Sequence, residues 1–371
     1  MKIFQFIGTR PELIKLAPIE WAARNFPELT LSSYFTGQHV ELVEQLASEL
    51  DINFRLFTNP SASDASLSDK VSSILAASGR LIADERPDLV IVQGDTASAL
   101  ACALAASCNR VPVAHVEAGL RSFDRTAPWP EENLRRQLTQ IADVHFAPTD
   151  LARENLIAEG VSDSAIRVVG NTVIDSVRAI LANSSAQVDT RWTTGRKIGI
   201  LTMHRREMLM EKGAPNIIEC VRELSEKLDI SFIFPVHPSP VLRQQLESSE
   251  FGSYIKLVDP IQYPDFIRML HTADLVVTDS GGIQEEATFL KIPTLCLRGV
   301  TERPEAVSSG AVSLVGSHPP SLVPAAVAAL ARDRETIRNT VFGTGDSAER
   351  ILDHIVRTFG GCRYSREDRP S

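Results

Sequence analysis

The sequence has few of the features that mark secreted, membrane-bound or disulfide-stabilised proteins. It contains five cysteines in 371 residues and no Cys-x-x-Cys pair, which indicates reduced thiols and not a disulfide framework. No apolar run approaches the roughly 20 residues that span a bilayer. The first apolar stretch ends at Thr9, too early for the core of a signal peptide. We therefore expect a soluble, cytoplasmic protein that does not bind a membrane.

Several cofactor-binding motifs are also missing. The sequence has neither the G-x-G-x-x-G turn of dinucleotide-binding domains nor the G-x-x-x-x-G-K-[ST] loop of NTPases. None of its four tyrosines has a lysine four residues further on, which excludes the NAD-dependent redox enzymes that use a Tyr/Lys pair. No D-x-D pair and no histidine-carboxylate cluster offers a site for a divalent metal. We therefore expect chemistry that needs neither a cofactor nor a metal.

The charge and composition limit the partners and the domain count. The formal net charge of -9 is spread along the chain, which argues against nucleic acid or an anionic membrane as a partner. Hydrophobic residues make up 43% of the chain, enough for two separate cores. Short apolar runs alternate with longer amphipathic segments, a pattern typical of parallel sheets built from βαβ units. The expected strands are residues 3–7, 89–92, 111–116, 197–202, 230–236, 275–278 and 294–297.

These segments predict an α/β protein with two doubly wound parallel-sheet domains. The stretch of residues 181–195 is polar and rich in small side chains, and we expect the domain boundary there. Ligands of open parallel sheets bind beyond the carboxyl ends of the strands. The residues that follow each strand are therefore the candidates for function.

Charged residues follow the first expected strand. Gly8 and Arg10 precede the start of a helix, and Lys15 lies one turn further on. A glycine turn, a helix N-terminus and two cations suit an anion such as a diphosphate. A capped helix with solvated charges explains the same residues equally well.

Carboxylates follow two further strands of the first half. Asp95 and Glu117 each come after a buried strand. Asp95 can simply cap the next helix, and taken alone this role is favoured, whereas Glu117 has no comparable structural role. Glu131 and Glu132 stand in the first turn of another helix, where acids complement the helix dipole. This local explanation is adequate for Glu132 but not for both residues.

Cationic residues and glycines follow strands of the second half. His204 adjoins Arg205 at a strand end, and together they suit a phosphate. A lone histidine such as His237 is more often structural. The turn 280–282 offers backbone N–H groups to a diphosphate, and Glu286, one helical turn further on, can accept hydrogen bonds from ribose hydroxyls.

Seven motifs in one order make the pattern specific: GTRPE, QGDT, HVEAGLRS, PWPEE, HRRE, TDSGGIQEE and TERPEAV. In order and spacing, the chain resembles the non-hydrolysing UDP-N-acetylglucosamine 2-epimerases from about residue 2 to residue 315. The resemblance implies the glycosyltransferase-B architecture, in which two Rossmann-like domains face each other across a cleft and the C-terminal helix crosses back to the first. The expected parts are a catalytic domain at 1–175, a UDP-binding domain at 190–345, the returning helix at 346–360 and a flexible tail at 361–371.

The resemblance also implies an activity. Members of the family interconvert UDP-N-acetylglucosamine (UDP-GlcNAc) and UDP-N-acetylmannosamine (UDP-ManNAc) by eliminating UDP to 2-acetamidoglucal and adding it back, with no cofactor. A homodimer that serves cell-surface polysaccharide biosynthesis is implied as well. Carried over by motif, the catalytic residues are Asp95, Glu117, Glu131 and His204. The substrate-binding residues are Arg10, Lys15, Arg135, Arg205, His237, Phe266, Ser280, Gly281, Gly282, Glu286 and Arg303. Among these, Phe266 is expected to border the uracil and Arg303 to contact the nucleotide.

Three departures from the family pattern leave other activities open. Leu134 and Met208 stand where asparagine is usual, and Met203 stands where a small residue is common. These changes keep the carboxylates but leave the exact sugar open. The alternatives are an epimerase of a modified UDP-sugar, a hydrolysing 2-epimerase, a glycosyltransferase of the same architecture and a non-catalytic sugar-nucleotide sensor.

A fourth departure concerns regulation. Many bacterial relatives bind a second UDP-GlcNAc as an activator, through a Q-H-R-x-M segment and an arginine on a nearby loop. Here the segment reads QHVEL at residues 38–42, so Glu41 brings a negative charge, and Asp64 stands in place of the loop arginine. An anionic diphosphate would be repelled by these charges. We therefore expect that activation by the substrate is lost or that the second site takes another nucleotide, unless Glu41 simply faces solvent.

Overall fold

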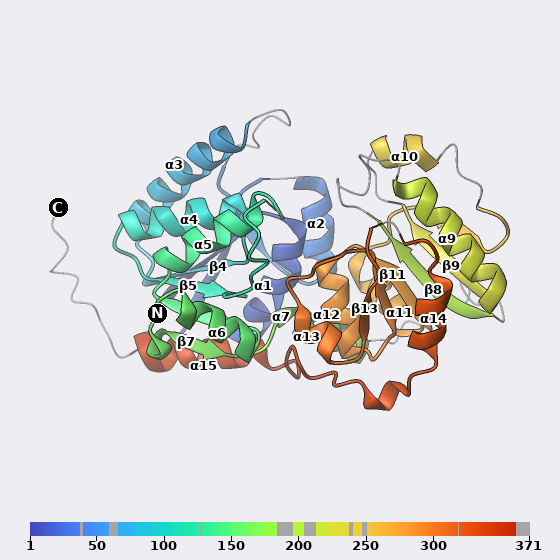
Figure 1. The fold of residues 1–371 in the computed structure, drawn as a ribbon. Coiled ribbons are helices and arrows are strands. Elements are labelled where there is room, and N and C mark those ends of the chain that lie inside the picture. The colour runs from blue at the N-terminus through green and yellow to red at the C-terminus, as the bar shows by residue number, and fades with distance from the viewer. Residues whose placement is uncertain are drawn as a thin grey trace. The chain divides into compact units, whose positions relative to one another are not determined.

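The computed structural model describes residues 1–37, 40–58, 66–126, 128–183, 196–203, 213–236, 240–246, 251–317 and 319–360. The chain divides into two compact units, Met1–Ser176 with Gly343–Ser371 and Val177–Phe342. Each unit contains a parallel sheet with helices on both faces (Figure 1). The prediction of an α/β fold with two parallel sheets is confirmed.

The first unit is built on a seven-stranded sheet in the order β3-β2-β1-β4-β5-β6-β7. Its strands are β1 (Lys2–Ile7), β2 (Thr30–Phe35), β3 (Phe54–Leu56), β4 (Leu89–Gln93), β5 (Val113–Val116), β6 (Val144–Ala147) and β7 (Ile166–Val168). The strand order reverses between β1 and β4, which are neighbours in parallel register. This reversal is the point at which open α/β sheets bind their ligands.

The helices of the first unit cover both faces of this sheet. They are α1 (Arg10–Ala23), α2 (Val40–Glu49), α3 (Leu67–Glu85), α4 (Ala97–Cys108), α5 (Glu131–Ile141), α6 (Asp150–Ala158) and the start of α7 (Thr172–Ala182), with a 3₁₀ turn η1 at Asp163–Ala165. The residues of α7 from Val177 onward belong to the second unit. Helices α3, α4 and α5 share one apolar cluster with β1, β4 and β5 (Figure 1). Side-chain caps start four of these helices: Thr9 for α1, Ser66 for α3, Thr96 for α4 and Thr149 for α6. These caps supply acceptors to N–H groups that have no partner within the helix.

The second unit is built on a six-stranded sheet in the order β10-β9-β8-β11-β12-β13. Its strands are β8 (Lys197–Thr202), β9 (Ile230–Pro235), β10 (Ile255–Val258), β11 (Leu275–Thr278), β12 (Thr294–Cys296) and β13 (Val312–Leu314). Its helices are α9 (Gly213–Leu228), α10 (Pro240–Leu246), α11 (Tyr263–His271), α12 (Gly281–Phe289), α13 (Pro304–Ser308) and α14 (Val323–Leu330), with a 3₁₀ turn η3 at Arg334–Thr336. The strand order reverses between β8 and β11, so this sheet has a switch point of its own.

The last helix of the chain belongs to the first unit. Helix α15 (Ser347–Phe359) packs against α1 and buries one apolar face, which includes Ile351, Leu352 and Ile355. Its first turn is held by Asp175, whose Oδ1 accepts a hydrogen bond of 2.8 Å from the backbone N–H of Ala348. The return of the C-terminal helix to the first unit is thus a feature of the fold, as predicted.

The strand prediction is right for β1, β4, β5, β8, β9, β11 and β12 and misses the other strands of the described structure, including all four edge strands. The predicted strand 111–116 begins only at Val113, because the N–H of Val111 bonds to Ala106 O at the end of α4 and Pro112 has no N–H. Six strands were not predicted: β2, β3, β6, β7, β10 and β13. Three of these have only three residues, too few for a periodic pattern to be recognised.

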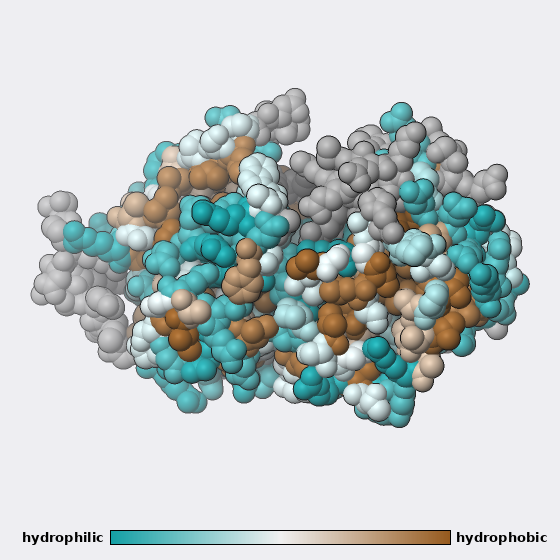
Figure 2. All heavy atoms as spheres, viewed as in Figure 1, coloured by the Kyte–Doolittle hydropathy of each residue, from teal (hydrophilic) through white to brown (hydrophobic). Residues whose placement is uncertain are grey.

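The face of the molecule drawn in Figure 2 is mainly polar where it is described. Figure 2 shows polar side chains over most of the visible face, with larger apolar areas on the second unit. Within the described part of the chain, no helix is both long enough and apolar enough to cross a membrane.

Candidate active site

Glu117 is held by three nitrogen donors immediately after β5. The ammonium group of Lys15 lies 2.6 Å from both of its carboxylate oxygens. The side-chain amide of Asn171 donates to Oε1 at 3.0 Å, and the amide of Gln93 donates to Oε2. Lys15 and Glu117 are both buried, and a buried ion pair needs such additional hydrogen bonds to offset the loss of hydration. This network keeps a carboxylate in one orientation in a place sheltered from water.

The backbone of Glu117 is strained. Its φ of 63° lies in the left-handed region, which non-glycine residues seldom adopt and which costs about 1–3 kcal/mol. The side chain therefore leaves the strand in a direction that a regular β conformation does not give. Gly94, in the turn after β4, lies next to it, since a Cβ on Gly94 would be 3.8 Å from Glu117 Oε2.

Asp95 is not the cap of the helix that follows it. Thr96 is the N-cap of α4 and accepts a hydrogen bond of 3.0 Å from the N–H of Ala99. Asp95 instead forms an ion pair with Arg135 of α5. The local structural explanation of Asp95, favoured when this residue is taken alone, is wrong, because the neighbouring threonine already fills that role.

Glu131 and Glu132 begin α5 but differ in their surroundings. Glu132 is fully buried, accepts 3.0 Å hydrogen bonds from the N–H of Ser122 and from Arg136 Nε, and lies 3.4 Å from Arg135 Nη1. Its role is structural, as predicted from its position. Glu131 has a buried Oε2 with no hydrogen-bond partner among the described residues. A buried carboxylate oxygen without a partner is costly and marks Glu131 as the member of the pair that can meet a ligand.

His115 supports the turn that carries Asp95. It lies on β5, is fully buried, and its Nε2 is 2.7 Å from the carbonyl oxygen of Gly94. Burial lowers the pKa of His115 to about 4, so the ring is neutral near pH 7 and its Nε2–H donates to that carbonyl. Gly94 has a φ of 73°, which glycine adopts without strain.

The turn after β11 presents a helix N-terminus at the switch point of the second sheet. Thr278 Oγ1 lies 2.6 Å from Thr202 Oγ1 and accepts a hydrogen bond of 3.0 Å from the N–H of Ser280. Gly281 and Gly282 are the first residues of α12, so their N–H groups belong to the four that have no acceptor within the helix. Of the three predicted donors, the N–H of Ser280 is thus already engaged by Thr278.

Arg303 lies so close to Gly281 that a side chain at this position would overlap with it. A Cβ on Gly281 would lie 2.5 Å from Arg303 Nη1, whereas a Cβ on Gly282 would meet nothing within 4 Å. Arg303 is held by Glu285 at 2.6 Å and lies 3.6 Å from Glu302. Burial acts to raise the pKa of Glu302, but Arg298 and Arg303 hold it well below its usual range. The result is a charged cluster that fixes the guanidinium of Arg303 beside the N-terminus of α12.

Glu286 is oriented by Tyr263. The hydroxyl of Tyr263 donates a 2.9 Å hydrogen bond to Glu286 Oε1, and both residues are buried. Phe266 lies on the same helix as Tyr263 and is partly exposed. The predicted ribose and uracil contacts thus come from two adjacent helices, α11 and α12.

Some predicted residues lie outside the described part of the chain. These are His204, Arg205 and His237 of the site, together with residues 38 and 39 and Asp64 of the expected activator region. Glu41 is described; it is exposed in the first turn of α2. Within the described residues, no group of three or more histidine, cysteine, aspartate or glutamate side chains is placed to hold a metal ion.

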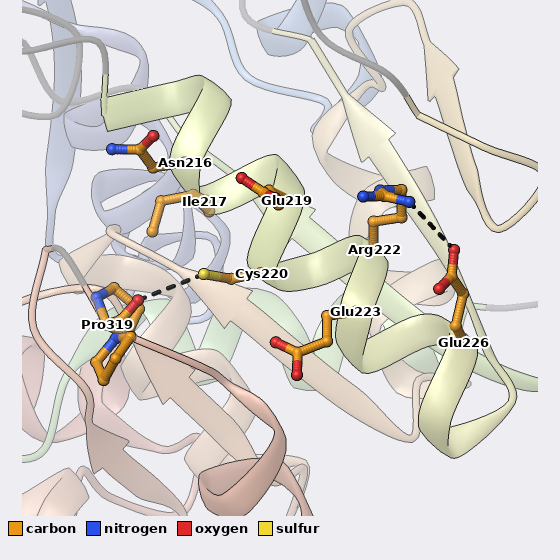
Figure 3. A pocket seen from close by; sticks show the side chains of 9 residues that line it. Asn216, Ile217, Glu219, Cys220, Arg222, Glu223, Glu226 and Pro319 are labelled. Carbon is orange, nitrogen blue, oxygen red and sulfur yellow. Dashed lines mark hydrogen bonds and ion pairs between the residues drawn. The ribbon is translucent and has the colours of Figure 1, made fainter.

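A separate hollow of about 500 Å³ lies between α9 and residues 319–320 of the second unit. Figure 3 shows the carboxylates of Glu219, Glu223 and Glu226 on this side of α9, with Cys220 facing Pro319. Arg222, the basic side chain in the lining, pairs with Glu226 at 3.5 Å. Its charge does not suit the phosphates of a nucleotide, so this hollow is not the predicted site.

Comparisons with known proteins place the chain in a family. The profile described as UDP-N-acetylglucosamine 2-epimerase matches residues 22–356. The UDP-N-acetylglucosamine 2-epimerase of Escherichia coli strain K12 is 36% identical over 376 residues, covering 96% of this chain and 98% of the relative. The chain belongs to the UDP-N-acetylglucosamine 2-epimerase family.

Solved structures of family members have the same fold. The crystal structure of UDP-GlcNAc 2-epimerase from Neisseria meningitidis bound to UDP-GlcNAc superimposes with a TM-score of 0.89 at 33% identity and covers 96% of this chain and 100% of the neighbour. The enzyme of Methanocaldococcus jannaschii in complex with UDP-GlcNAc and UDP gives a TM-score of 0.83 at 35% identity, with coverages of 96% and 100%. Both of these structures contain UDP-GlcNAc.

The sequence did not reveal the residues that orient the predicted groups in this family member. Gln93, Asn171, His115, Thr278 and Tyr263 each donate to, accept from or fix a predicted site residue. Gln93, His115 and Thr278 lie inside recognised motifs, so their membership of a motif could have marked them as candidates. Asn171 and Tyr263 lie in no recognised motif, and their partners are distant in the sequence.

Proposed function

We propose that this chain catalyses the reversible C2 epimerisation of UDP-GlcNAc to UDP-ManNAc without net hydrolysis. The observation that carries the proposal is the buried Glu117 carboxylate, fixed by Lys15, Gln93 and Asn171 beside the turn that bears Asp95. A strained, sheltered and oriented carboxylate at a strand end is typical of an acid/base group. Neither a sensor nor a simple nucleotide-binding protein needs one.

The chemistry proceeds by elimination and re-addition. A base removes the C2 proton, the C–H electron pair forms the C1=C2 double bond, and the C1–O bond breaks with its electron pair going to the β-phosphate of UDP. The products of this step are 2-acetamidoglucal and UDP. In the second step an oxygen of that phosphate bonds to C1, and C2 receives a proton on the opposite face. Water takes no part, and the two steps together change only the configuration at C2.

Two proton-transfer groups are needed, one on each face of the sugar, and three carboxylates are candidates. Asp95 and Glu117 follow neighbouring strands, and Glu131 lies on α5, the helix that also supplies Arg135 to Asp95. A positioned proton-transfer group typically contributes about 10²- to 10⁴-fold in rate. We assign the acid/base role to these three residues, with the order of proton removal and return open among them.

The departing UDP requires positive charge and N–H donors. We propose that Arg10, Lys15, His204 and the N-terminus of α12 at Gly281 and Gly282 stabilise the charge that grows on the β-phosphate. Arg135, Arg205 and His237 complete the set of polar contacts to the substrate.

The nucleoside half of UDP is proposed to bind the second unit. Glu286 accepts the ribose hydroxyls, Phe266 borders the uracil and Arg303 contacts the nucleotide. The fixed orientation of Glu286 by Tyr263 and of Arg303 by Glu285 supports these roles. As expected from the family, we propose a cytoplasmic homodimer that uses no cofactor.

Proton NMR of the purified protein with UDP-GlcNAc in D₂O tests the proposal. Deuterium at C2 with both epimers of the nucleotide sugar present is the expected result. Free N-acetylmannosamine plus UDP would identify a hydrolysing 2-epimerase instead. An unchanged UDP-GlcNAc signal would overturn the proposal, and a panel of modified UDP-sugars would then separate another epimerase from a sensor.

A further inference from the structure

Glu12 is a buried carboxyl group that the proposed reaction leaves without a role. It lies in the first turn of α1 and is 2% exposed. Its Oε2 accepts a hydrogen bond of 3.1 Å from the N–H of Gly8, and its Oε1 accepts one of 2.7 Å from the hydroxyl of Thr96. Glu12 therefore joins the turn after β1 to the turn after β4, the two strands at which the sheet order reverses.

This link ends one residue away from Asp95. Thr96 both donates to Glu12 and caps α4 through the N–H of Ala99, so its position fixes the turn that presents Asp95. The turn after β1 is closely packed here, because a Cβ on Gly8 would lie 2.3 Å from Ser98 Oγ and 3.0 Å from Glu12 Oε2. Through Thr96, Glu12 is linked to the turn that presents Asp95.

The surroundings of Glu12 disfavour its charged form. Burial raises the pKa of Glu12 to about 7, and the negative charge of Asp95 acts in the same direction. On α4, Cys102 lies near Glu12. Burial raises the pKa of the Cys102 thiol, which is therefore uncharged. On α1 itself the basic residues are Arg10 and Lys15, and Lys15 is paired with Glu117. The hydrogen-bond partners of the Glu12 carboxyl group are the side chains of Thr96 and Thr9 and the backbone N–H of Gly8, none of which carries a charge.

We propose that Glu12 is a positioning residue for the reaction proposed above and that it acts as a neutral carboxyl bridge to the Asp95 turn. A neutral carboxyl group has one O–H donor and one carbonyl acceptor. In the structure both carboxyl oxygens of Glu12 accept, one from the N–H of Gly8 and one from the hydroxyl of Thr96. In the neutral form the carbonyl oxygen still accepts from Gly8, and the carboxyl O–H donates to Thr96 Oγ1 after the Thr96 hydroxyl has rotated. Loss of the proton places a buried negative charge near the negative Asp95 and lowers turnover. The inference rests on the proposed function, because Asp95 has its acid/base role only in that reaction.

The pH profile of kcat distinguishes this role from a merely structural one. The amide of Glu12→Gln reproduces the donor and the acceptor of a neutral carboxyl group but cannot ionise. For wild type we expect kcat to fall on the alkaline side from near neutral pH. In Glu12→Gln we expect the alkaline fall in kcat to begin at least about one pH unit higher, with a maximal kcat that is several-fold lower than in wild type. In Glu12→Ala we expect kcat to be about 100-fold lower at every pH. Glu28→Gln, an exposed carboxylate-to-amide change in the same unit, should keep the wild-type profile.

The kcat profiles of wild type and of Glu12→Gln show separately whether the role of Glu12 or the proposed function is wrong. If Glu12→Gln has the same kcat as wild type and the same fall in kcat at alkaline pH, the role of Glu12 is overturned but the proposed function is not. If the wild-type protein shows no turnover at any pH, the proposed function is overturned and the inference with it. Should Glu12→Gln fail to fold, Thr96→Ser and Thr96→Val test the same bridge from its other end. Retention of kcat within several-fold in the serine variant and loss of about 100-fold in the valine variant are expected, and equal kcat in the two would overturn the bridge.

Discussion

At the scale of single residues, the arrangement around Glu117 combines three unfavourable features. The residue has a left-handed backbone, a buried charge and a buried cation as its partner. The backbone conformation costs free energy that only glycine would avoid, and the buried ion pair costs free energy that apolar side chains would avoid. Their occurrence together at one strand end is understandable if the carboxylate has chemistry to perform. The same holds for Glu131 Oε2, which has no hydrogen-bond partner among the residues that the structure describes.

Amide substitutions test the acid/base assignment. We expect Asp95→Asn, Glu117→Gln and Glu131→Gln each to lower kcat by about two orders of magnitude or more, because an amide cannot exchange the proton. Binding of UDP, measured by calorimetry, should change little. Asp84→Asn, at an exposed position on α3, is the matched control. Turnover close to wild type in any two of the three variants would contradict the assignment.

Removal of one hydroxyl group tests the ribose site. Tyr263→Phe deletes the donor to Glu286 and leaves the ring in place, so the carboxylate loses its fixed orientation. We expect KM for UDP-GlcNAc to rise several-fold, corresponding to about 1 kcal/mol for one hydrogen bond, with kcat nearly unchanged. Tyr254→Phe is the control, since the ring of Tyr254 meets Arg196 and a phenylalanine keeps that contact. A drop in kcat at constant KM would assign Tyr263 to the chemical step instead.

At the scale of elements, the turn after β5 depends on a glycine for two separate reasons. Gly119 has a φ of 90°, and a Cβ on it would lie 2.2 Å from the carbonyl oxygen of Ala152 on α6. The turn can therefore approach α6 closely only without a side chain. This packing positions the segment that begins at Glu117.

A pair of alanine variants separates the two reasons. Gly160 also has a φ of 90°, but a Cβ there would meet nothing within 4 Å. Gly160→Ala should lower the free energy of unfolding by about 1–2 kcal/mol from backbone strain. Gly119→Ala should cost about 1–3 kcal/mol more through steric overlap. Denaturant unfolding of both variants measures the difference, and equal costs would show that α6 moves away freely.

At the scale of the whole molecule, helix α15 is attached to the rest of the first unit through a buried acid. Asp175 of α7 accepts the N–H of Ala348 at the start of α15, and burial raises the pKa of Asp175 from 3.8 to about 6. A carboxyl group with a raised pKa stabilises the folded state fully below its unfolded pKa, and that stability is lost as the pH rises through the folded pKa.

The sign of this effect gives a pH-dependent prediction. Asp175→Asn keeps an acceptor for Ala348 but does not ionise, so the stability of the variant relative to wild type should increase as the pH rises from 4 to 7. The increase is at most about 3 kcal/mol, from about 1.4 kcal/mol per pH unit over a window of about two units. Urea denaturation at pH 4 and pH 7.5 measures it, with Asp353→Asn on the exposed side of α15 as control. A difference that is independent of pH would contradict the burial of a charge at Asp175.

Much of the architecture could be read from the sequence because its determinants are local. Apolar β-branched runs at regular intervals predicted the central strands, and the glycines, prolines and caps between them predicted where helices start. The positions of Asp95, Glu117 and Glu131 at such junctions predicted the candidate carboxylates. The order of the motifs predicted the family, which the comparisons confirm. The short edge strands were missed because three residues carry no period.

The tertiary structure alone decided which side chains meet. Lys15 and Glu117 are 102 residues apart, and Tyr263 and Glu286 are 23 apart on two helices. Such pairs depend on the register of the strands and on which face each helix covers, and both are settled by the packing of the whole core. For the same reason the sequence determined that Asp95 follows a strand, whereas only the folded chain showed that Thr96 caps the helix and Arg135 takes the carboxylate.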